Sequence, residues 1–171
     1  MEHVEHGFGP VWNRESRVLI LGSMPSPKSR EVGFYFMHPR NRFWPLMAQL
    51  LKTEIGESIE ERTNFLLSNH VALWDVIASC DITGAQDSTI TNAVANDLKP
   101  ILSQAPITSV FTSGSKATQL YRKLVLPQLN ENNISLPLTS LPSTSPANAA
   151  MVLDTLCSAY SPLLLALGLR K

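Results

Sequence analysis

The chain has 171 residues, of which 44% are hydrophobic and 16% are charged, so it can bury a core and is not disordered as a whole. Fourteen Lys and Arg residues balance fourteen Asp and Glu residues, and this neutral total argues against a non-specific binder of polyanions. Two cysteines are too few for a disulfide framework or a four-thiolate metal site. We expect one domain, residues 1–171, and, because the polar N-terminus is unlike a signal peptide, a cytoplasmic location.

Four short apolar runs predict β-strands. They lie at residues 17–22, 70–74, 108–112 and 136–141, each near a turn or loop signal. Nearly continuous apolar strands are typical of a parallel sheet that is covered on both faces.

Helical patterns lie between these runs. Apolar spacing predicts helices within residues 43–51, 59–67 and 94–102, and a fourth helix directly after Gly114. The apolar stretch 149–169 contains Pro162 and an acidic residue, so we interpret it as part of a buried helix that begins near Ala147 and kinks at Pro162, not as a membrane span. The alternation predicts an α/β fold, a three-layer sandwich with a central, mainly parallel four-stranded sheet flanked by helices. Ligands of such sheets bind beyond the carboxyl ends of the strands.

The loop after the first strand, residues 22–27, is one candidate binding segment. It holds Gly22, Ser23 and Met24, and its prolines stiffen the backbone. Its amides and hydroxyls could hold a phosphate or the edge of a base, and the alternative is an ordinary turn.

The segment 33–44 packs five aromatic rings, a His, an Asn and two Arg into twelve residues. Its last two aromatic residues begin a helix, whereas Phe34, Tyr35 and Phe36 lie in a loop beside cations, as base stacking and phosphate contact require. Asn41 has two open interpretations, a helix cap or an active-site amide. His38 is a candidate neutral hydrogen-bond donor.

The loop after the last strand, residues 141–148, is rich in hydroxyls. Ser143, Thr144 and Ser145 could clamp a phosphate, and the alternative is an ordinary helix N-cap. Basic residues outnumber acidic ones five to one between residues 24 and 52, which predicts a positive patch. The candidate phosphate contacts are Lys28, Arg40, Arg42, Lys116, Thr144 and Ser145. Asp75 and Asp87 lie in polar connections, where they could touch substrate or be solvated.

The chain resembles the uracil-DNA glycosylase superfamily in three segments, GSMPS (22–26), GFYFMHPRNRFW (33–44) and LPSTS (141–145). The resemblance spans the chain from about Arg17 onward and is closest to the mismatch-specific and hypoxanthine-DNA glycosylase branches. It implies a monofunctional DNA glycosylase that hydrolyses the N-glycosidic bond of a deaminated base and leaves an abasic site. It also implies a monomer with DNA as its partner, without cofactor, metal or membrane attachment.

The resemblance carries over residue by residue. Met24 stands where the mismatch-specific branch has a water-positioning Asn, and Leu141 stands where other branches have His or Asn, so hypoxanthine is favoured over uracil. Asn41 matches the catalytic amide of the hypoxanthine branch. The implied substrate-binding residues are Gly22, Ser23, Met24, Phe36, His38 and Ser143, with Phe36 stacked on the extruded base. The residue that fills the gap in the duplex falls near Ser145, which is small.

Three alternatives stay open. The first is a G:U or G:T mismatch-specific uracil or thymine glycosylase. The second is a non-catalytic α/β nucleotide-binding module, and the third is a damaged-DNA binder that cleaves no bond.

Overall fold

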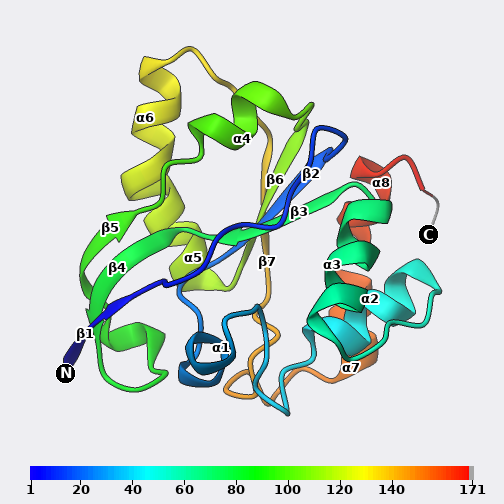
Figure 1. Ribbon diagram of the computed structural model, residues 1–171, viewed down its shortest axis with the longest axis horizontal. Coiled ribbons are helices and arrows are strands. Elements are labelled where there is room, and N and C mark those ends of the chain that lie inside the picture. Colours follow the sequence, from blue (N-terminus) through cyan, green and yellow to red (C-terminus); the bar gives the residue numbers. More distant parts are fainter. Residues whose placement is uncertain (170–171) are drawn as a thin grey trace.

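The structure, a computed structural model that describes residues 1–169, contains a four-stranded sheet at its centre. The strand order is β3-β2-β6-β7, and Figure 1 shows these strands running through the middle of the molecule. The strands are β2 (Val18–Gly22), β3 (Val71–Asp75), β6 (Ser109–Ser113) and β7 (Leu138–Leu141). All three neighbouring pairs are parallel, which confirms the four predicted strands and the fold class.

Helices cover both faces of this sheet (Figure 1). On one face lie α2 (Phe43–Leu51), α3 (Ile59–Ser68), α7 (Leu153–Ala159) and α8 (Ser161–Ala166), and on the other α4 (Lys99–Gln104), α5 (Ser115–Leu120) and α6 (Leu126–Glu131). Val18 and Ile20 of β2 pack into the first core, and Leu19 and Leu21 pack into the second. Because successive side chains of a strand point to opposite faces, a sheet buried on both faces needs the uninterrupted apolar run seen in β2.

A second, antiparallel sheet was not predicted. Its strand order is β1 (Glu2–Glu5), β4 (Ile77–Ile82) and β5 (Thr91–Ala95). Strand β4 follows β3 after a single residue, so the chain passes directly from one sheet into the other (Figure 1). Polar residues interrupt the buried apolar ones of these strands, such as Ile77, Cys80 and Ile82 of β4, so the strands lack the continuous apolar run that marked the central strands.

Two helix predictions need correction. The segment 94–102 is not one helix, because β5 ends at Ala95 and α4 begins at Lys99, with Pro100 in the first turn of α4, where its missing N–H costs nothing. The last helix begins at Leu153 rather than near Ala147, and the chain breaks at Tyr160, because Pro162 lies in the first turn of α8. The short connection η2 (Tyr121–Val125) is a π-helical turn between α5 and α6.

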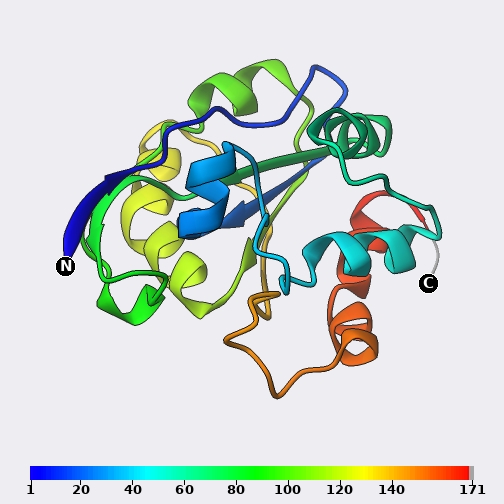
Figure 2. The same ribbon diagram turned by 60° about the horizontal axis from the view of Figure 1, so that its bottom comes forward.

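Two loops that are far apart in sequence lie side by side at the carboxyl edge of the sheet. In Figure 2 the segment before α2 and the segment before α7 pass next to each other, and the backbone N–H of Arg42 donates to the carbonyl of Thr144 at 3.1 Å. The short helix α1 (Pro27–Val32) follows the first loop at the same edge. Within residues 1–169, no helix is both long enough and apolar enough to cross a bilayer.

Candidate active site

A cavity of about 900 Å³ opens beyond the carboxyl ends of the central strands. Its walls come from residues within the segments 22–29, 35–41, 82–88, 113–116 and 142–151, together with Asp75 at the end of β3. This is the edge of the sheet where the sequence placed the binding loops.

All of the residues expected to bind substrate line this cavity, and so does the expected catalytic amide. They are Gly22, Ser23, Met24, Phe36, His38, Asn41 and Ser143. Of the expected phosphate contacts, Lys116, Thr144 and Ser145 also line it. Lys28 and Arg40 are exposed outside the cavity, and the ammonium of Lys28 lies 3.8 Å from the carboxylate of Glu31.

The side chain of Asn41 is fixed by two hydrogen bonds to its oxygen. Oδ1 accepts from the backbone N–H of Phe43 at 2.9 Å and from the hydroxyl of Thr144 at 2.9 Å. Since a backbone N–H can only donate, the atom that faces Phe43 must be the oxygen, which settles the orientation of the amide. Both lone-pair sites of Oδ1 are therefore used, and the two N–H groups of Nδ2 are the part of the amide left to interact with a ligand.

Asn41 both supports the start of a helix and lines the cavity, as the two interpretations of its role separately require. The bond to Phe43 supports the start of α2, although the N-cap residue itself is Arg42 and makes no side-chain cap. Asn41 also lines the cavity. The local turn therefore positions an amide for the cavity, and the cap and the site are not exclusive.

Phe36 has a strained backbone and a stacked ring. Its φ is +54°, in the left-handed region that aromatic residues rarely adopt, and strain of this kind clusters at functional sites. One face of the ring stacks on Phe43 with 4.2 Å between the ring centroids and 20° between the planes. Because Phe36 also lines the cavity, the ring is backed by the core and can offer its other face to a planar ligand. Phe34 and Tyr35, in contrast to the expectation, are buried in the hydrophobic core.

Asp75 is buried against the first loop, which corrects the expectation that it could be a solvated loop residue. It is 4% exposed, and its Oδ2 accepts from Nε2 of His6 at 2.7 Å. Its Oδ1 would lie 2.4 Å from a β-carbon at Gly22, so only glycine leaves room for the carboxylate there. The same β-carbon would lie 4.0 Å from the ring of Phe36, which places the carboxylate, the glycine and the ring in one corner of the cavity.

His6 is a buried residue that the sequence did not reveal. It is 4% exposed and packs against the rings of Phe8 and Tyr35 at 4.5 and 6.0 Å between centroids. It lies 69 positions before Asp75, in a segment that carries no motif, so no local signal pairs the two residues. Burial, with the nearby Asp75 charge, raises the pKa of Tyr35 well above its usual range, and its neutral hydroxyl donates to the carbonyl of Gly9 at 2.7 Å.

The side chain of Arg42 is bound by backbone carbonyls of the loop before α7. Its guanidinium donates to the backbone carbonyls of Ser145 at 2.8 Å, Asn148 at 2.9 Å and Met151. In the free protein, Arg42 therefore fastens the loop before α7, because three carbonyls of that loop turn toward it, and its contact with a phosphate stays a prediction.

The hydroxyl of Tyr160 also holds the loop after β7 in place. The hydroxyl of Tyr160 donates to the carbonyl of Pro142 at 2.8 Å and lies 3.0 Å from Oγ of Ser113. Burial raises the pKa of Tyr160 to about 12, so the phenol keeps its proton at neutral pH. The loop that carries Ser143 and Thr144 is thus rigidly placed over the sheet edge.

The two apolar positions of the motifs are packed differently. Leu141 is 3% exposed and belongs to a hydrophobic core, outside the cavity lining. Met24 is 8% exposed and lines the cavity while it packs on the other core. Neither side chain can activate water.

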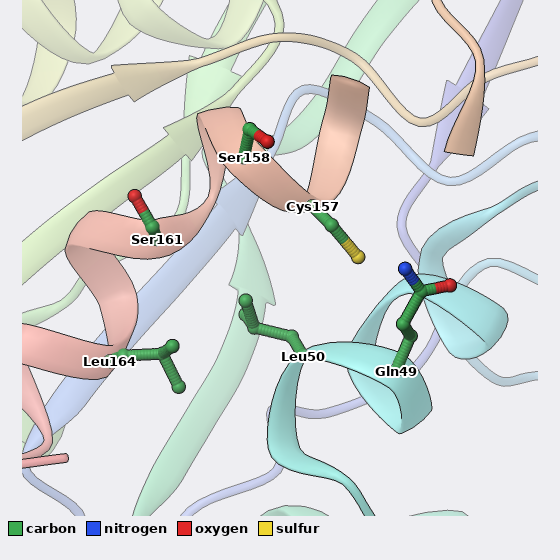
Figure 3. A pocket seen from close by; sticks show the side chains of 6 residues that line it. All are labelled: Gln49, Leu50, Cys157, Ser158, Ser161 and Leu164. Atoms are coloured by element: carbon green, nitrogen blue, oxygen red, sulfur yellow. The ribbon is translucent and has the colours of Figure 1, made fainter. Parts of the chain in front are cut away.

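A second, smaller cavity of about 310 Å³ lies between α2 and the C-terminal helices (Figure 3). Figure 3 shows Cys157 of α7 and Leu50 of α2 on its walls. Burial raises the pKa of the Cys157 thiol, so the protonated form dominates at neutral pH and a nucleophile is not formed. Within residues 1–169 no group of three or more His, Cys, Asp or Glu side chains is placed to hold a metal ion.

The fold and the large cavity define an α/β protein with a pocket at the sheet edge that combines an aromatic ring, an amide and hydroxyl-rich loops. A model of the uracil DNA glycosylase superfamily matches residues 10–160. The chain belongs to this superfamily. It is a DNA glycosylase, a hydrolase of N-glycosidic bonds whose substrate is DNA.

Individual relatives agree with this assignment. A hypoxanthine DNA glycosylase from Methanosarcina acetivorans is 30% identical over 147 residues, which cover 85% of this chain and 89% of the relative. A hypoxanthine DNA glycosylase from Methanosarcina barkeri is 27% identical over 133 residues, covering 77% and 84%. The solution NMR structure of a candidate uracil DNA glycosylase from Methanosarcina acetivorans superposes with a TM-score of 0.77 at 27% identity, over 94% of this chain and 96% of that chain.

Proposed function

We propose that this glycosylase removes hypoxanthine from DNA, with Asn41 as the catalytic amide. The observation that carries the proposal is the fixed orientation of Asn41, whose oxygen is occupied by Phe43 and Thr144 while the residue lines the cavity. The names of two relatives support the choice of base. The apolar side chains of Met24 and Leu141 support it further, because the polar groups that uracil-excising branches use are missing at both positions.

The base first leaves the duplex and enters the cavity. Extrusion costs about a few kcal/mol and less for a mispaired base, which favours hypoxanthine over a normally paired base. The extruded purine lies against Phe36, which is already stacked on Phe43, so the base extends an existing stack.

Bond cleavage then moves negative charge onto the departing base. The Nδ2 group of Asn41 donates to an acceptor on the base, and the backbone N–H groups of Ser23 and Met24 are the second set of donors. Donors fixed in this way can stabilise a transition state by about 3–4 kcal/mol. With both lone-pair sites of Oδ1 taken, Asn41 acts on the base and leaves the attacking water to another group.

The DNA backbone is held by the hydroxyl-rich loop and by cations. Ser143, Thr144, Ser145 and Lys116 line the cavity and are suited to the phosphates that flank the extruded base. Lys28 and Arg40 are exposed beside it and contact the backbone farther along. In this proposal the protein acts in the cytoplasm as a monomer, and gel filtration with and without duplex tests its oligomeric state.

The test is a panel of duplexes, each with one inosine, uracil or thymine opposite a defined base, treated with alkali and sized on a gel. Hypoxanthine release in excess of uracil and thymine release supports the proposal. Preferential cleavage at uracil or thymine would identify a mismatch-specific glycosylase instead. Tight binding of the inosine duplex without alkali-labile sites would identify a non-catalytic binder.

A further inference from the structure

Neither Met24 nor the oxygen of Asn41 is available to guide the attacking water. Met24 occupies the place of the water-positioning side chain in the first loop and has no polar atom that can do this work. The oxygen of Asn41 already accepts two hydrogen bonds. Hydrolysis still requires an acceptor for a proton of the water, so a further residue of the cavity wall must supply it.

Asp87 supplies a carboxylate beside the first loop. It begins the short 3₁₀ helix η1 (Asp87–Thr89), lines the cavity, and its Oδ2 accepts from the hydroxyl of Ser23 at 2.7 Å. Ser23 is the neighbour of Met24, so the carboxylate stands next to the position from which the polar side chain is missing. The residue as a whole is exposed, but its carboxyl is turned inward to Ser23.

The charges around Asp87 suit a proton acceptor. Loss of hydration raises the pKa of its carboxyl, the hydrogen bond from Ser23 opposes this, and the charge of Asp75 adds to the rise, while that of Lys116 opposes it. The charge of Asp87 also helps to raise the pKa of the Cys80 thiol on β4, after burial, which is the largest cause. A carboxylate with a raised pKa is a stronger base than one in free solution.

The position of this charge is also costly for DNA binding. A carboxylate at the mouth of a DNA-binding cavity repels the phosphates, so it weakens the ground-state complex. It becomes favourable only when the bond to the base breaks and the sugar gains positive charge. An interaction of this kind raises the rate of the chemical step without improving substrate affinity.

We propose that Asp87 orients and deprotonates the water that attacks the sugar, with Ser23 holding its carboxylate in place. The water oxygen forms a bond to C1′ of the deoxyribose, and the bond from C1′ to the base nitrogen breaks with its electron pair leaving on the base. One proton of the water passes to the carboxylate of Asp87. The base leaves as an anion stabilised by Asn41 and takes up a proton from solvent.

The structure offers a variant that separates this role from a structural one. Asp87→Asn keeps an oxygen that can accept from Ser23 but removes the charge and the proton acceptor. The loop around it is also held by a bond from the N–H of Thr83 to the hydroxyl of Thr89 at 2.9 Å, which the substitution leaves intact. The matched control is Asp97→Asn, which removes the same charge at an exposed residue outside the cavity that accepts from the N–H of Lys99.

The experiment measures single-turnover base release and, separately, affinity for an uncleavable duplex with a tetrahydrofuran abasic analogue. For Asp87→Asn we expect the rate to fall about 100-fold or more, the affinity to stay the same or increase, and the acid limb of the pH–rate profile to disappear. Asp97→Asn should match the parent protein.

A rate of Asp87→Asn within tenfold of the parent, or equal losses of rate and affinity in this variant, overturns the proposal. The inference rests on the proposed function for the choice of base and for the role of Asn41. If the duplex panel shows that uracil is released instead, the same comparison on a uracil duplex tests Asp87.

Discussion

The hydroxyl of Thr144 donates to Oδ1 of Asn41 at 2.9 Å, across 103 positions of the sequence. The backbone N–H of Arg42 donates back to the carbonyl of Thr144, so two hydrogen bonds clamp the segment before α2 to the loop after β7. The amide proposed to contact the base is therefore oriented by the loop proposed to hold the DNA backbone. Contact of that loop with DNA and the orientation of Asn41 are mechanically linked.

Removing the Thr144 hydroxyl should weaken catalysis more than folding. Thr144→Val leaves Oδ1 of Asn41 with one partner, so we expect single-turnover base release to fall about tenfold, with a stability loss of about 1 kcal/mol. The control is Thr108→Val, which removes a hydroxyl that donates to the carbonyl of Arg17 at 3.2 Å, away from the cavity. Equal rates for both variants and the parent would show that the clamp does not orient the amide.

Substitutions of Asn41 should separate the cap from the catalytic amide. Asn41→Asp keeps the oxygen that accepts from Phe43 and Thr144 but replaces the Nδ2 donor with a second oxygen. We expect it to stay folded and to lose at least 100-fold in base release, because a donor to the base becomes an acceptor. Asn41→Ala should lose activity as well and about 1 kcal/mol of stability. Activity that follows stability alone, measured by urea unfolding, would reduce Asn41 to a cap.

Phe36 should contribute to binding of the extruded base more than to the fold. Phe36→Ala removes the stacking face, and base–aromatic stacking is worth about 1–3 kcal/mol, so affinity for inosine duplex should fall about 5- to 150-fold. The backbone strain at φ +54° stays in this variant, because alanine keeps the β-carbon that causes it. Phe34→Ala is the contrasting variant, because Phe34 is 4% exposed and stacks on Trp44 in the core, so its main loss should be stability. Fluorescence anisotropy and thermal melting measure the two effects.

His6 should be required for stability through Asp75. His6→Ala leaves the buried carboxylate without the hydrogen bond from Nε2, and losing a buried hydrogen bond to a charged group costs about 1.5–3 kcal/mol. His3→Ala is the matched control on the same N-terminal segment, since His3 is exposed and its partners Glu5 and Asp81 remain hydrated, so little change is expected. Urea unfolding at neutral pH compares the two variants. An unfolding free energy of His6→Ala close to that of the parent would show that Asp75 finds other partners.

Binding to DNA should depend on salt through the cations beside the cavity. Each phosphate contact releases about one counterion, so the logarithm of the affinity should fall linearly with the logarithm of salt concentration. Lys116→Ala should reduce this slope by about one, whereas Lys99→Ala, at an exposed residue in the first turn of α4, should leave it unchanged. Salt-independent binding by the parent would contradict phosphate contact by these residues.

The central sheet was predictable because each of its strands carries its own signal. The side chains of Val18 to Leu21 are buried on both faces of the sheet, so all four consecutive residues are apolar and the strand can be recognised from the sequence. The antiparallel sheet gave no such signal, because β5 is mostly exposed and pairs with β4 through backbone groups that any residue provides. The start of the last helix was misplaced for a related reason, since residues 147–152 are tied to Arg42 rather than to a helical ladder.

The amino-acid sequence by itself determined the parallel sheet, the binding loops at its carboxyl edge, and the segments that hold Asn41, Phe36 and Ser143. These are local properties, because apolar runs, turn residues and motifs are read from neighbouring positions. Only the tertiary structure decided that Thr144 occupies the oxygen of Asn41, that Arg42 fastens a loop, and that His6 pairs with Asp75. Each of these is a contact between residues more than 60 positions apart, and its partner is chosen by the packing of the whole chain rather than by any pattern near either residue.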